Sequence, residues 1–222
     1  FPNESPIWAW VCTQGWGQRA LVVGARQTLA AVLLVREGLA VTLIDADPGL
    51  LAQARAAIDD EPPHIRARLV TLEADLPSLA AEALFDCIVL VDALARQASP
   101  DRLLRQAANH LGQGGRVVVA DGLATSSQAM LAAPVLPRHL AEWARKTGLQ
   151  PKVMDIAAGC LRAVLTRPDP QATTDDDVDV LQLTESLAFA IRQDGIAQLG
   201  QRDALVRKLS GELQTCEGKL AD

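Results

Sequence analysis

The sequence predicts an α/β fold with a doubly wound, mostly parallel sheet, and three observations lead to that prediction. Short apolar segments alternate with helix-like segments along residues 20–147. The segment "FDCIVLVDAL" contains a continuous apolar stretch, which is typical of a parallel strand buried on both faces. The pairs Asp47-Pro48 and Ser99-Pro100 mark helix starts between apolar segments. Strands and helices that alternate in this way form a parallel sheet with helices on both faces.

Five strands and four helices are predicted in order up to residue 147. The strands cover residues 20–24, 40–44, 68–74, 85–94 and 112–122. The helices cover residues 29–37, 49–58, 100–111 and 137–147. Thr28, Asp47 and Ser99 are predicted as N-caps, because their side-chain oxygens can accept hydrogen bonds from free backbone N–H groups. Gly38 is predicted to end the first helix in a left-handed conformation, and "DDEPPHI" is predicted as a loop.

The sheet is predicted to finish with an antiparallel pair. The segment "PKVMDIAAGCLRAVLTRP" contains two apolar stretches joined by Ala157-Ala158-Gly159. A connection of this length is typical of a hairpin.

The composition favours one globular domain with additional length. The chain has 222 residues, of which 49% are hydrophobic and 22% are charged. We divide it into an N-terminal segment that packs on the domain (1–16), the α/β domain (17–167), an acidic linker (168–177) and a helical tail (178–222). The chain opens at Phe1 with no basic-then-apolar leader, so we expect an excised segment of a longer protein.

Charge and cysteine usage argue against several function classes. A net charge of -6 and a pI near 5.1 offer no surface that would neutralise phosphates, which disfavours a nucleic-acid or anionic-membrane binder. Four scattered cysteines without a CxxC motif predict neither a metal site nor a disulfide framework. The longest apolar run, residues 29–35, is too short to span a membrane. We therefore expect a cytoplasmic protein with small or neutral partners.

The tail carries a pattern that is typical of a short coiled coil. Apolar residues at alternating spacings of three and four form one seam, consisting of Val206, Leu209, Leu213, Cys216 and Leu220. An isolated stripe of this length needs a partner, so we expect oligomers that form by self-association through these residues.

Several segments of the domain resemble class I S-adenosylmethionine-dependent methyltransferases, which have a Rossmann-like fold. The resemblance rests on the order of elements and on "IDADPGLLAQAR", "FDCIVLVDAL", "LLRQAANHLGQGGRVVVAD" and "LAEWARKTGLQPKVMDI", and it covers residues 17–167. The Gly114-Gly115 turn and the final hairpin favour this family over NAD-binding domains. The resemblance implies S-adenosylmethionine as the cofactor and methyl transfer as the reaction.

The first strand and its turn depart from the family's pattern, which has an acid followed by a glycine-rich turn that holds the amino-acid part of the cofactor. Gly24 keeps the first glycine, Val22 stands at the position of the acid, and Arg26 and Thr28 replace the later two glycines. Arg26 either narrows the mouth of the pocket, because its Cβ hinders close approach, or pairs with the cofactor carboxylate. The resemblance makes Gly24 and Arg26 candidate cofactor-binding residues within a degenerate motif.

Three acids match family positions that contact the cofactor. Asp45 matches the acid that accepts hydrogen bonds from the ribose hydroxyls, although it also suits a purely structural place in the turn before Asp47. Asp75 matches the acid that contacts the adenine amino group, and it suits a helix N-cap equally well. Asp92 lies where relatives line the cofactor and substrate cavity, or else it ends a strand in solvent.

The sequence identifies no catalytic residue. Methyl transfer from a sulfonium depends largely on alignment, so no particular side chain is obligatory. None of the three histidines lies at a predicted strand carboxyl end; they are His64, His110 and His139. The lack of an "NPPY"-type element and of any tyrosine disfavours nucleic-acid methylation. Trp8, Trp10 and Trp16 are interpreted as anchors of the N-terminal segment, with a lid over the substrate as the alternative.

Two hypotheses about function follow. The first is a methyltransferase that acts on a small molecule or glycan with an atypical first loop, which Asp45 and Asp75 favour. The second is a methyltransferase-like scaffold or recognition domain that has lost cofactor binding and oligomerises through its coiled coil, which Val22, Arg26 and Thr28 favour. An NAD-binding regulatory domain is a third possibility, based on "VTLIDADP". Fold alone does not choose among them.

Overall fold

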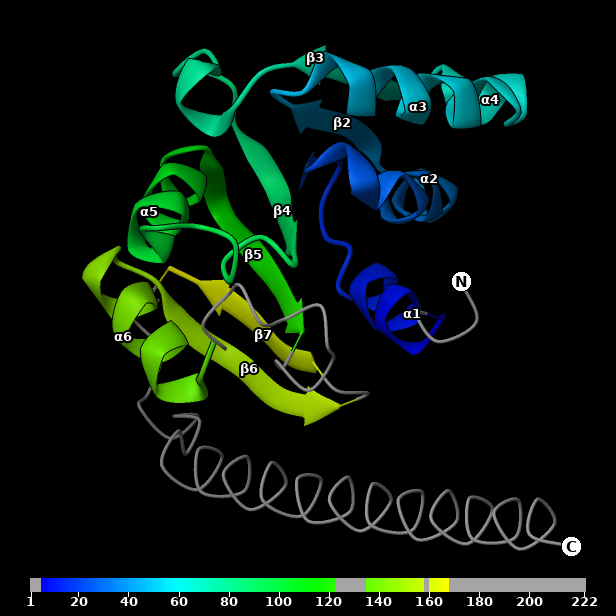
Figure 1. The fold of residues 1–222 in the computed structure, drawn as a ribbon. Helices are drawn as coiled ribbons and strands as arrows, with labels where there is room; N and C mark the ends of the chain where they lie inside the picture. Colours follow the sequence, from blue (N-terminus) through cyan, green and yellow to red (C-terminus); the bar gives the residue numbers. More distant parts are fainter. Residues whose placement is uncertain (1–4, 123–134, 158–159, 168–222) are drawn as a thin grey trace, which may run out of the picture. The chain divides into compact units, whose positions relative to one another are not determined.

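The computed structural model describes residues 5–122, 135–157 and 160–167. These residues form an α/β domain in which helices flank a mixed β-sheet (Figure 1). The strands are β1 (Arg19–Val23), β2 (Ala40–Asp45), β3 (Leu69–Glu73), β4 (Phe85–Val91), β5 (Leu111–Gly122), β6 (Gln150–Ala157) and β7 (Cys160–Thr166). The α-helices are α1 (Ser5–Thr13), α2 (Thr28–Arg36), α3 (Pro48–Asp59), α4 (Pro63–Arg66), α5 (Pro100–Asn109) and α6 (Pro137–Lys146). Two short 3-10 helices are η1 (Ala25–Gln27) and η2 (Leu76–Ser78).

The sheet has seven strands in the order β3-β2-β1-β4-β5-β7-β6. The first five strands are parallel to one another, and β7 pairs antiparallel with both β5 and β6. This arrangement confirms the mostly parallel sheet with a terminal antiparallel pair. The carboxyl ends of β1, β2 and β4 therefore meet at one edge of the sheet, where Val23 lies beside both Ile44 and Leu90.

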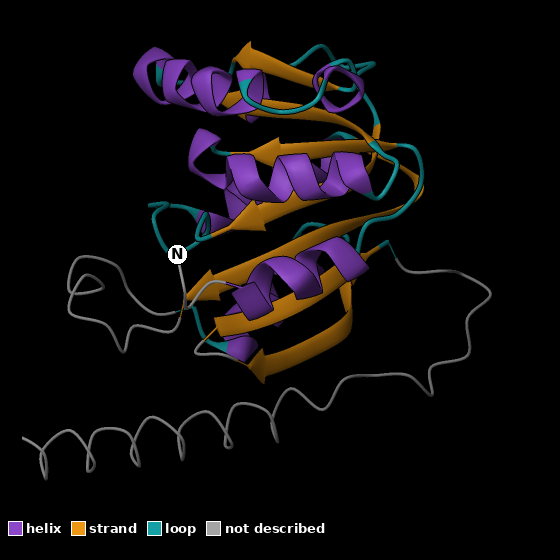
Figure 2. Cartoon of the chain, turned by 90° about the vertical axis from the view of Figure 1, so that its right-hand side faces the viewer, coloured by secondary structure: helices purple, strands orange, loops and turns teal. Residues whose placement is uncertain are grey.

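Helices cover both faces of the sheet. Figure 1 shows α1 to α4 on one side of the sheet and α5 and α6 on the other. On the first side α2 packs against α1, α3 and β2, and on the second α5 packs against α6 and β5. Figure 2 looks onto the first side, with its helices in front of the strands.

The core centres on β1 and β4. Ala20, Leu21 and Val22 of β1 are fully buried, as are residues 87–90 of β4. Burial of a leucine or valine side chain stabilises a fold by roughly 1.5–3 kcal/mol, so these two strands supply a large part of the folding free energy. Trp8 and Val11 of α1 belong to the same core cluster as the buried residues of α2.

Local signals placed most helix ends correctly, with two exceptions among the caps. Asp47 caps α3 as predicted, because its Oδ1 accepts hydrogen bonds from the N–H groups of Gly49 and Leu50. Thr28 is wrong as an N-cap: it is the first residue of α2, and its hydroxyl donates to the carbonyl of Ala25 instead. Ser99 occupies the N-cap position of α5 but makes no capping hydrogen bond through its side chain.

One further difference concerns a loop, whereas one turn agrees with its prediction. The predicted loop "DDEPPHI" contains α4, because a proline at the first helical position suits a short helical turn. Gly38 adopts a φ of 99°, as expected for the residue that ends α2.

Several predictions concern residues outside the described ranges. These are the hairpin residues 158–159, the acidic linker, and the helical tail with its apolar seam. Within the described part of the chain, no helix is long and apolar enough to cross a membrane. In those same ranges, Cys12, Cys87 and Cys160 are free thiols, and no three His, Cys, Asp or Glu side chains gather as a metal site.

A close contact at Asp86 joins the start of β1 to β4, and its role can be tested. Oδ2 of Asp86 accepts hydrogen bonds from the N–H groups of Gln18 and Arg19, at 2.7 and 2.9 Å. Gly17, just before them, has a φ of 76°, and a Cβ added there would lie 2.3 Å from the Cβ of Asp86. Gly148 has nearly the same φ of 74° with nothing within 4 Å.

We therefore expect Gly17→Ala to destabilise the domain more than Gly148→Ala. Both substitutions place a Cβ in a left-handed conformation, which costs about 1–2 kcal/mol, but only the first also displaces Asp86. Urea unfolding of the two variants measures the difference in the free energy of unfolding. Equal losses would contradict a steric role for Asp86.

Candidate functional site

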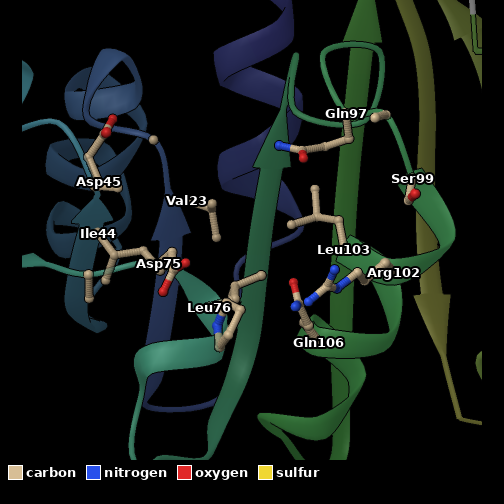
Figure 3. Close-up of a pocket in the computed structure, with 15 residues that line it drawn as sticks. Val23, Ile44, Asp45, Asp75, Leu76, Gln97, Ser99, Arg102, Leu103 and Gln106 are labelled. Carbon is tan, nitrogen blue, oxygen red and sulfur yellow. The ribbon is translucent and has the colours of Figure 1, made fainter.

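A cleft of about 450 Å³ lies at the carboxyl edge of the parallel strands (Figure 3). Its volume is typical of a small-molecule site. One wall comes from the ends of β1 and β2 and from the segment after β3, and the other comes from α5 and the residues before it. The lining residues are Val23, Gly24, Ile44, Asp45, Ala46, Ala74, Asp75, Leu76, Pro77, Gln97, Ala98, Ser99, Arg102, Leu103 and Gln106.

Gly24 makes the turn from β1 into η1. Its φ of 101° lies in the region that only glycine adopts readily. Its N–H donates to the carbonyl of Ile44 at 2.8 Å, which ties the turn to the end of β2. A Cβ at this position would meet no atom closer than 3.9 Å, so the requirement for glycine is conformational rather than steric.

Asp45, the last residue of β2, is half-buried and lines the cleft. Its Oδ2 accepts a hydrogen bond from the N–H of Ala25 at 2.7 Å, and its Oδ1 accepts one from the N–H of Asp47 at 2.9 Å. The carboxylate therefore joins the turn after β1 to the start of α3. Each carboxylate oxygen has two acceptor sites, so this structural role leaves capacity for a ligand.

Asp75 follows β3 and lies on the same wall of the cleft as Asp45. It caps η2, because its Oδ1 accepts a hydrogen bond from the N–H of Ser78 while the Ser78 Oγ accepts one from the backbone N–H of Asp75. Within the described ranges no residue donates to its Oδ2. The N-cap that the sequence suggested is therefore present, and the same residue borders the cleft.

The opposite wall consists of residues that the sequence did not indicate as part of a site, although Ser99 among them was predicted as an N-cap. Ser99, Arg102, Leu103 and Gln106 are spaced three and four apart, so they share one face of α5. Figure 3 shows Arg102 and Gln106 extending from α5 toward the side on which Asp75 and Leu76 lie. The helical spacing was visible in the sequence, but nothing local indicated that this face borders a cleft.

Arg26 and Asp92 lie outside the cleft lining. Arg26 is exposed on η1. Asp92 adopts a φ of 47°, and its Oδ1 accepts a hydrogen bond from the N–H of Gly122 at 2.9 Å. The structure thus brings three of the five candidate residues together at the cleft: Gly24, Asp45 and Asp75.

Asp121, which the sequence analysis did not single out, is completely buried at the end of β5. Its two oxygens accept hydrogen bonds from the N–H groups of Leu94 and Ala95, at 3.4 and 3.0 Å. Burial, together with the nearby Asp92, raises the pKa of this carboxyl from 3.8 to about 6, although the backbone hydrogen bonds and Arg96 lower it. Asp121 therefore anchors the segment that leads to Gln97 and Ser99 of the cleft.

Two of the three described histidines, His110 and His139, have structural contacts. The ring nitrogens of His110 lie 3.1 and 3.0 Å from the carbonyls of Ala83 and Leu76. His139 stacks on Trp143 in α6. None of the three described histidines, His64 included, lines the cleft or ends a strand, in agreement with the expectation that no histidine lies at a strand carboxyl end.

Comparison with known proteins identifies the fold. A family model described as a methyltransferase domain, Methyltransf_12, matches residues 21–117, which is less than half of the chain. The glycopeptide N-methyltransferase MtfA, complexed with S-adenosyl-L-homocysteine, superimposes with a TM-score of 0.63 at 13% identity, over 74% of this chain and 87% of MtfA. The domain has the class I methyltransferase fold.

Two further structures share this methyltransferase fold over about half of their own length. The mitomycin 7-O-methyltransferase MmcR has a TM-score of 0.61 and 19% identity, over 74% of this chain and 54% of its own. An O-methyltransferase from neocarzinostatin biosynthesis, in complex with S-adenosylmethionine and a naphthoic acid, has a TM-score of 0.60 and 21% identity, over 74% and 53%. No curated protein sequence matches the chain.

S-adenosylmethionine, the cofactor that the methyltransferase fold implies, fits the cleft through its nucleoside. Asp45 and Asp75 offer carboxylate oxygens, and Ile44, Leu76 and Leu103 offer apolar surface for a base. These residues would hold the ribose and the base.

The buried Asp121 predicts a specific pH dependence of stability. The native carboxyl titrates near pH 6 and the unfolded one near 3.8, so between these values the native state holds a proton that the unfolded state has released. The native state is therefore destabilised as pH rises through this window, by about 3 kcal/mol in total. Asp121→Asn, which carries no charge, should lack this loss.

Urea unfolding of the wild type and Asp121→Asn from about pH 4 to about pH 7 measures the effect, since other titrating groups cancel in the difference. The wild type should lose stability relative to the variant as pH rises. A difference that stays constant across the range would show that Asp121 is not perturbed by burial.

Proposed function

We propose that this chain is an S-adenosylmethionine-dependent methyltransferase that acts on a small molecule or glycan. One observation carries the proposal: Asp45 and Asp75, from neighbouring strand ends, line one cleft at the carboxyl edge of a class I methyltransferase fold. Ligands of open α/β sheets bind at this edge, and carboxylates there suit the hydroxyl and amino groups of a nucleoside.

The bound cofactor would supply the methyl group, and the chain would supply binding and orientation. The described residues that line the cleft include no histidine, cysteine or lysine. Alignment of the methyl acceptor can provide much of the rate enhancement, so the cleft does not need a general base to support the proposal. Asp45 and Asp75 would fix the nucleoside, and Asp121 would hold the segment of Gln97 and Ser99 in place.

The choice of a small acceptor has two sources of support. The similar structures include methyltransferases named for a glycopeptide and for mitomycin, both small compared with nucleic acids. The chain has a net charge of -6, which disfavours a polyanionic acceptor. A methyl acceptor of modest size and no strong negative charge is the best match to these observations.

A cofactor-free scaffold or recognition domain is the second candidate, and the first turn is the observation that favours it. The turn after β1 keeps only Gly24 and continues directly into η1 and α2. If the chain is a cofactor-free scaffold, its function would depend on the proposed self-association of the tail. That self-association would use the apolar seam of Val206, Leu209, Leu213, Cys216 and Leu220. The oligomers would bring several copies of this domain together.

Titration of the purified chain with S-adenosylhomocysteine by calorimetry tests the proposal. We expect Asp45→Asn to weaken binding roughly 10- to 100-fold, as for the loss of a hydrogen bond to a charged group. Asp47→Ala is the matched control, because Asp47 caps α3 two residues away but does not line the cleft. That variant should lose about 1 kcal/mol of stability and keep its affinity.

Two outcomes would count against the methyltransferase. Absence of heat and of a thermal shift at high ligand concentration would favour the scaffold. Equal loss of affinity in Asp45→Asn and Asp47→Ala would show that the carboxylate acts only through the turn.

A further inference from the structure

The sheet has a switch point between β1 and β4, and the crevice there is the usual ligand site of open α/β sheets. In the strand order β3-β2-β1-β4-β5 the direction of winding reverses at this pair. A ligand that filled the crevice would lie against the turn after β1 and against the end of β4. The residues at these two ends therefore decide how much of a ligand the crevice admits.

Gln27 spans this crevice. Its side chain extends from η1, after β1, and its Nε2 donates to the carbonyl of Val91, the last residue of β4, at 3.1 Å. The residue is 8% exposed, which is unusual for a polar side chain this close to a ligand cleft. Its backbone N–H donates to the carbonyl of Gly24 at 3.0 Å, so the turn is closed by its own hydrogen bond.

The cleft accordingly lies to one side of the switch point. Its lining includes Val23 and Gly24, extends over the ends of β2 and β3, and reaches α5. Gln27, Val91 and Asp92 are not part of that lining. The open space is thus beside Asp45 and Asp75, and the side chain of Gln27 crosses the adjoining crevice.

The polar groups around Gln27 are paired within the protein. The hydroxyl of Thr28 donates to Ala25, and the carboxylate of Asp92 accepts from Gly122. Val22 is apolar and fully buried. An ammonium and a carboxylate together need several acceptors and donors, and burying them without these is costly. The side chains of Gln27 and Thr28 already donate to backbone carbonyls, and Val22 is apolar, so an amino-acid substituent placed there would compete with these bonds and would find, among the described residues, only Asp92 as a side-chain acceptor.

We infer that the cleft recognises its ligand through an adenosine-type nucleoside alone, and that Gln27 is the specificity-determining residue that keeps an amino-acid substituent out of the crevice. This inference rests on the proposed function, because it concerns the same cleft and the same cofactor. Asp45 and Asp75 hold the nucleoside, and whatever is attached to its 5′ carbon contributes little affinity.

A ligand series with the unmodified chain tests the inference. Calorimetry compares adenosine, 5′-methylthioadenosine, S-adenosylhomocysteine and S-adenosylmethionine. We expect 5′-methylthioadenosine and S-adenosylhomocysteine to bind within about threefold of each other, because they differ only in the amino-acid portion. Binding of S-adenosylhomocysteine that is about thirtyfold tighter or more would overturn the inference and leave the proposed function standing.

The remaining outcomes separate the two proposals. Binding of the two nucleosides without binding of either amino-acid-bearing ligand would support exclusion of the amino-acid substituent from the crevice, but it would overturn both the expected near-equal affinities and the methyltransferase. Failure of all four ligands to bind would overturn both.

Variants at Gln27 test the assigned residue. Gln27→Ala should open the crevice and free the carbonyl of Val91, so the affinity for S-adenosylhomocysteine should rise about tenfold relative to 5′-methylthioadenosine. Gln27→Met keeps the volume of the side chain and should preserve the wild-type ratio. The readout is a ratio of two affinities, so a general loss of stability does not mimic the effect.

Arg26→Ala is the matched control, because Arg26 is exposed beside Gln27 and does not line the cleft. It should leave the ratio unchanged. A selective loss of affinity for S-adenosylhomocysteine in this variant would show that Arg26 pairs with the ligand carboxylate, and it would overturn the inference. An unchanged ratio in Gln27→Ala would overturn the role of Gln27.

Discussion

The parallel pairing of β1 with β2 on one side and β4 on the other is the constraint on which the rest of the domain depends. Residues 20–22 are fully buried, so the strand is held by apolar packing on both faces as well as by hydrogen bonds along both edges. This pairing brings the carboxyl ends of β1, β2 and β4 to one edge. The cleft, its two carboxylates and the first turn all lie at that edge because the strands that precede them are parallel and in register.

The four aspartates at this edge of the sheet all accept hydrogen bonds from backbone N–H groups. Asp45 joins two turns, Asp75 caps η2, Asp92 binds the backbone of Gly122, and Asp121 binds the segment after β4. A carboxylate has four acceptor sites, so a structural bond and a ligand bond are compatible in one residue. What distinguishes Asp45 and Asp75 from Asp92 and Asp121 is their position on the cleft wall. Asp45 and Asp75 therefore combine a structural hydrogen bond with a place on the cleft wall.

The first turn shows how a fold and its chemistry can separate. Gly24 preserves the backbone conformation that leads from β1 toward α2. Arg26 and Thr28 supply side chains where a glycine-rich turn would expose backbone, and Gln27 lies buried between them. The fold tolerates this change because Arg26 lies in solvent and Gln27 finds a partner on β4. The side chain of Gln27 thereby crosses the space between the end of β1 and the end of β4, which is why we infer that this side chain limits what a ligand can place there.

Local patterns in the sequence determined the order and type of most elements, the cap at Asp47 and the antiparallel end of the sheet. These features depend on residues a few positions apart, such as the acid-proline pair and the alternation of strands with helices. The sequence also predicted that Asp45 lies at the carboxyl edge of the sheet, because this residue directly follows the predicted strand 40–44. Only the tertiary structure decided which acids share a cleft, that α5 forms its second wall, and that Gln27 reaches Val91, 64 residues away in the chain. Contacts between segments so far apart depend on how the strands pack together, and no local pattern encodes that distance.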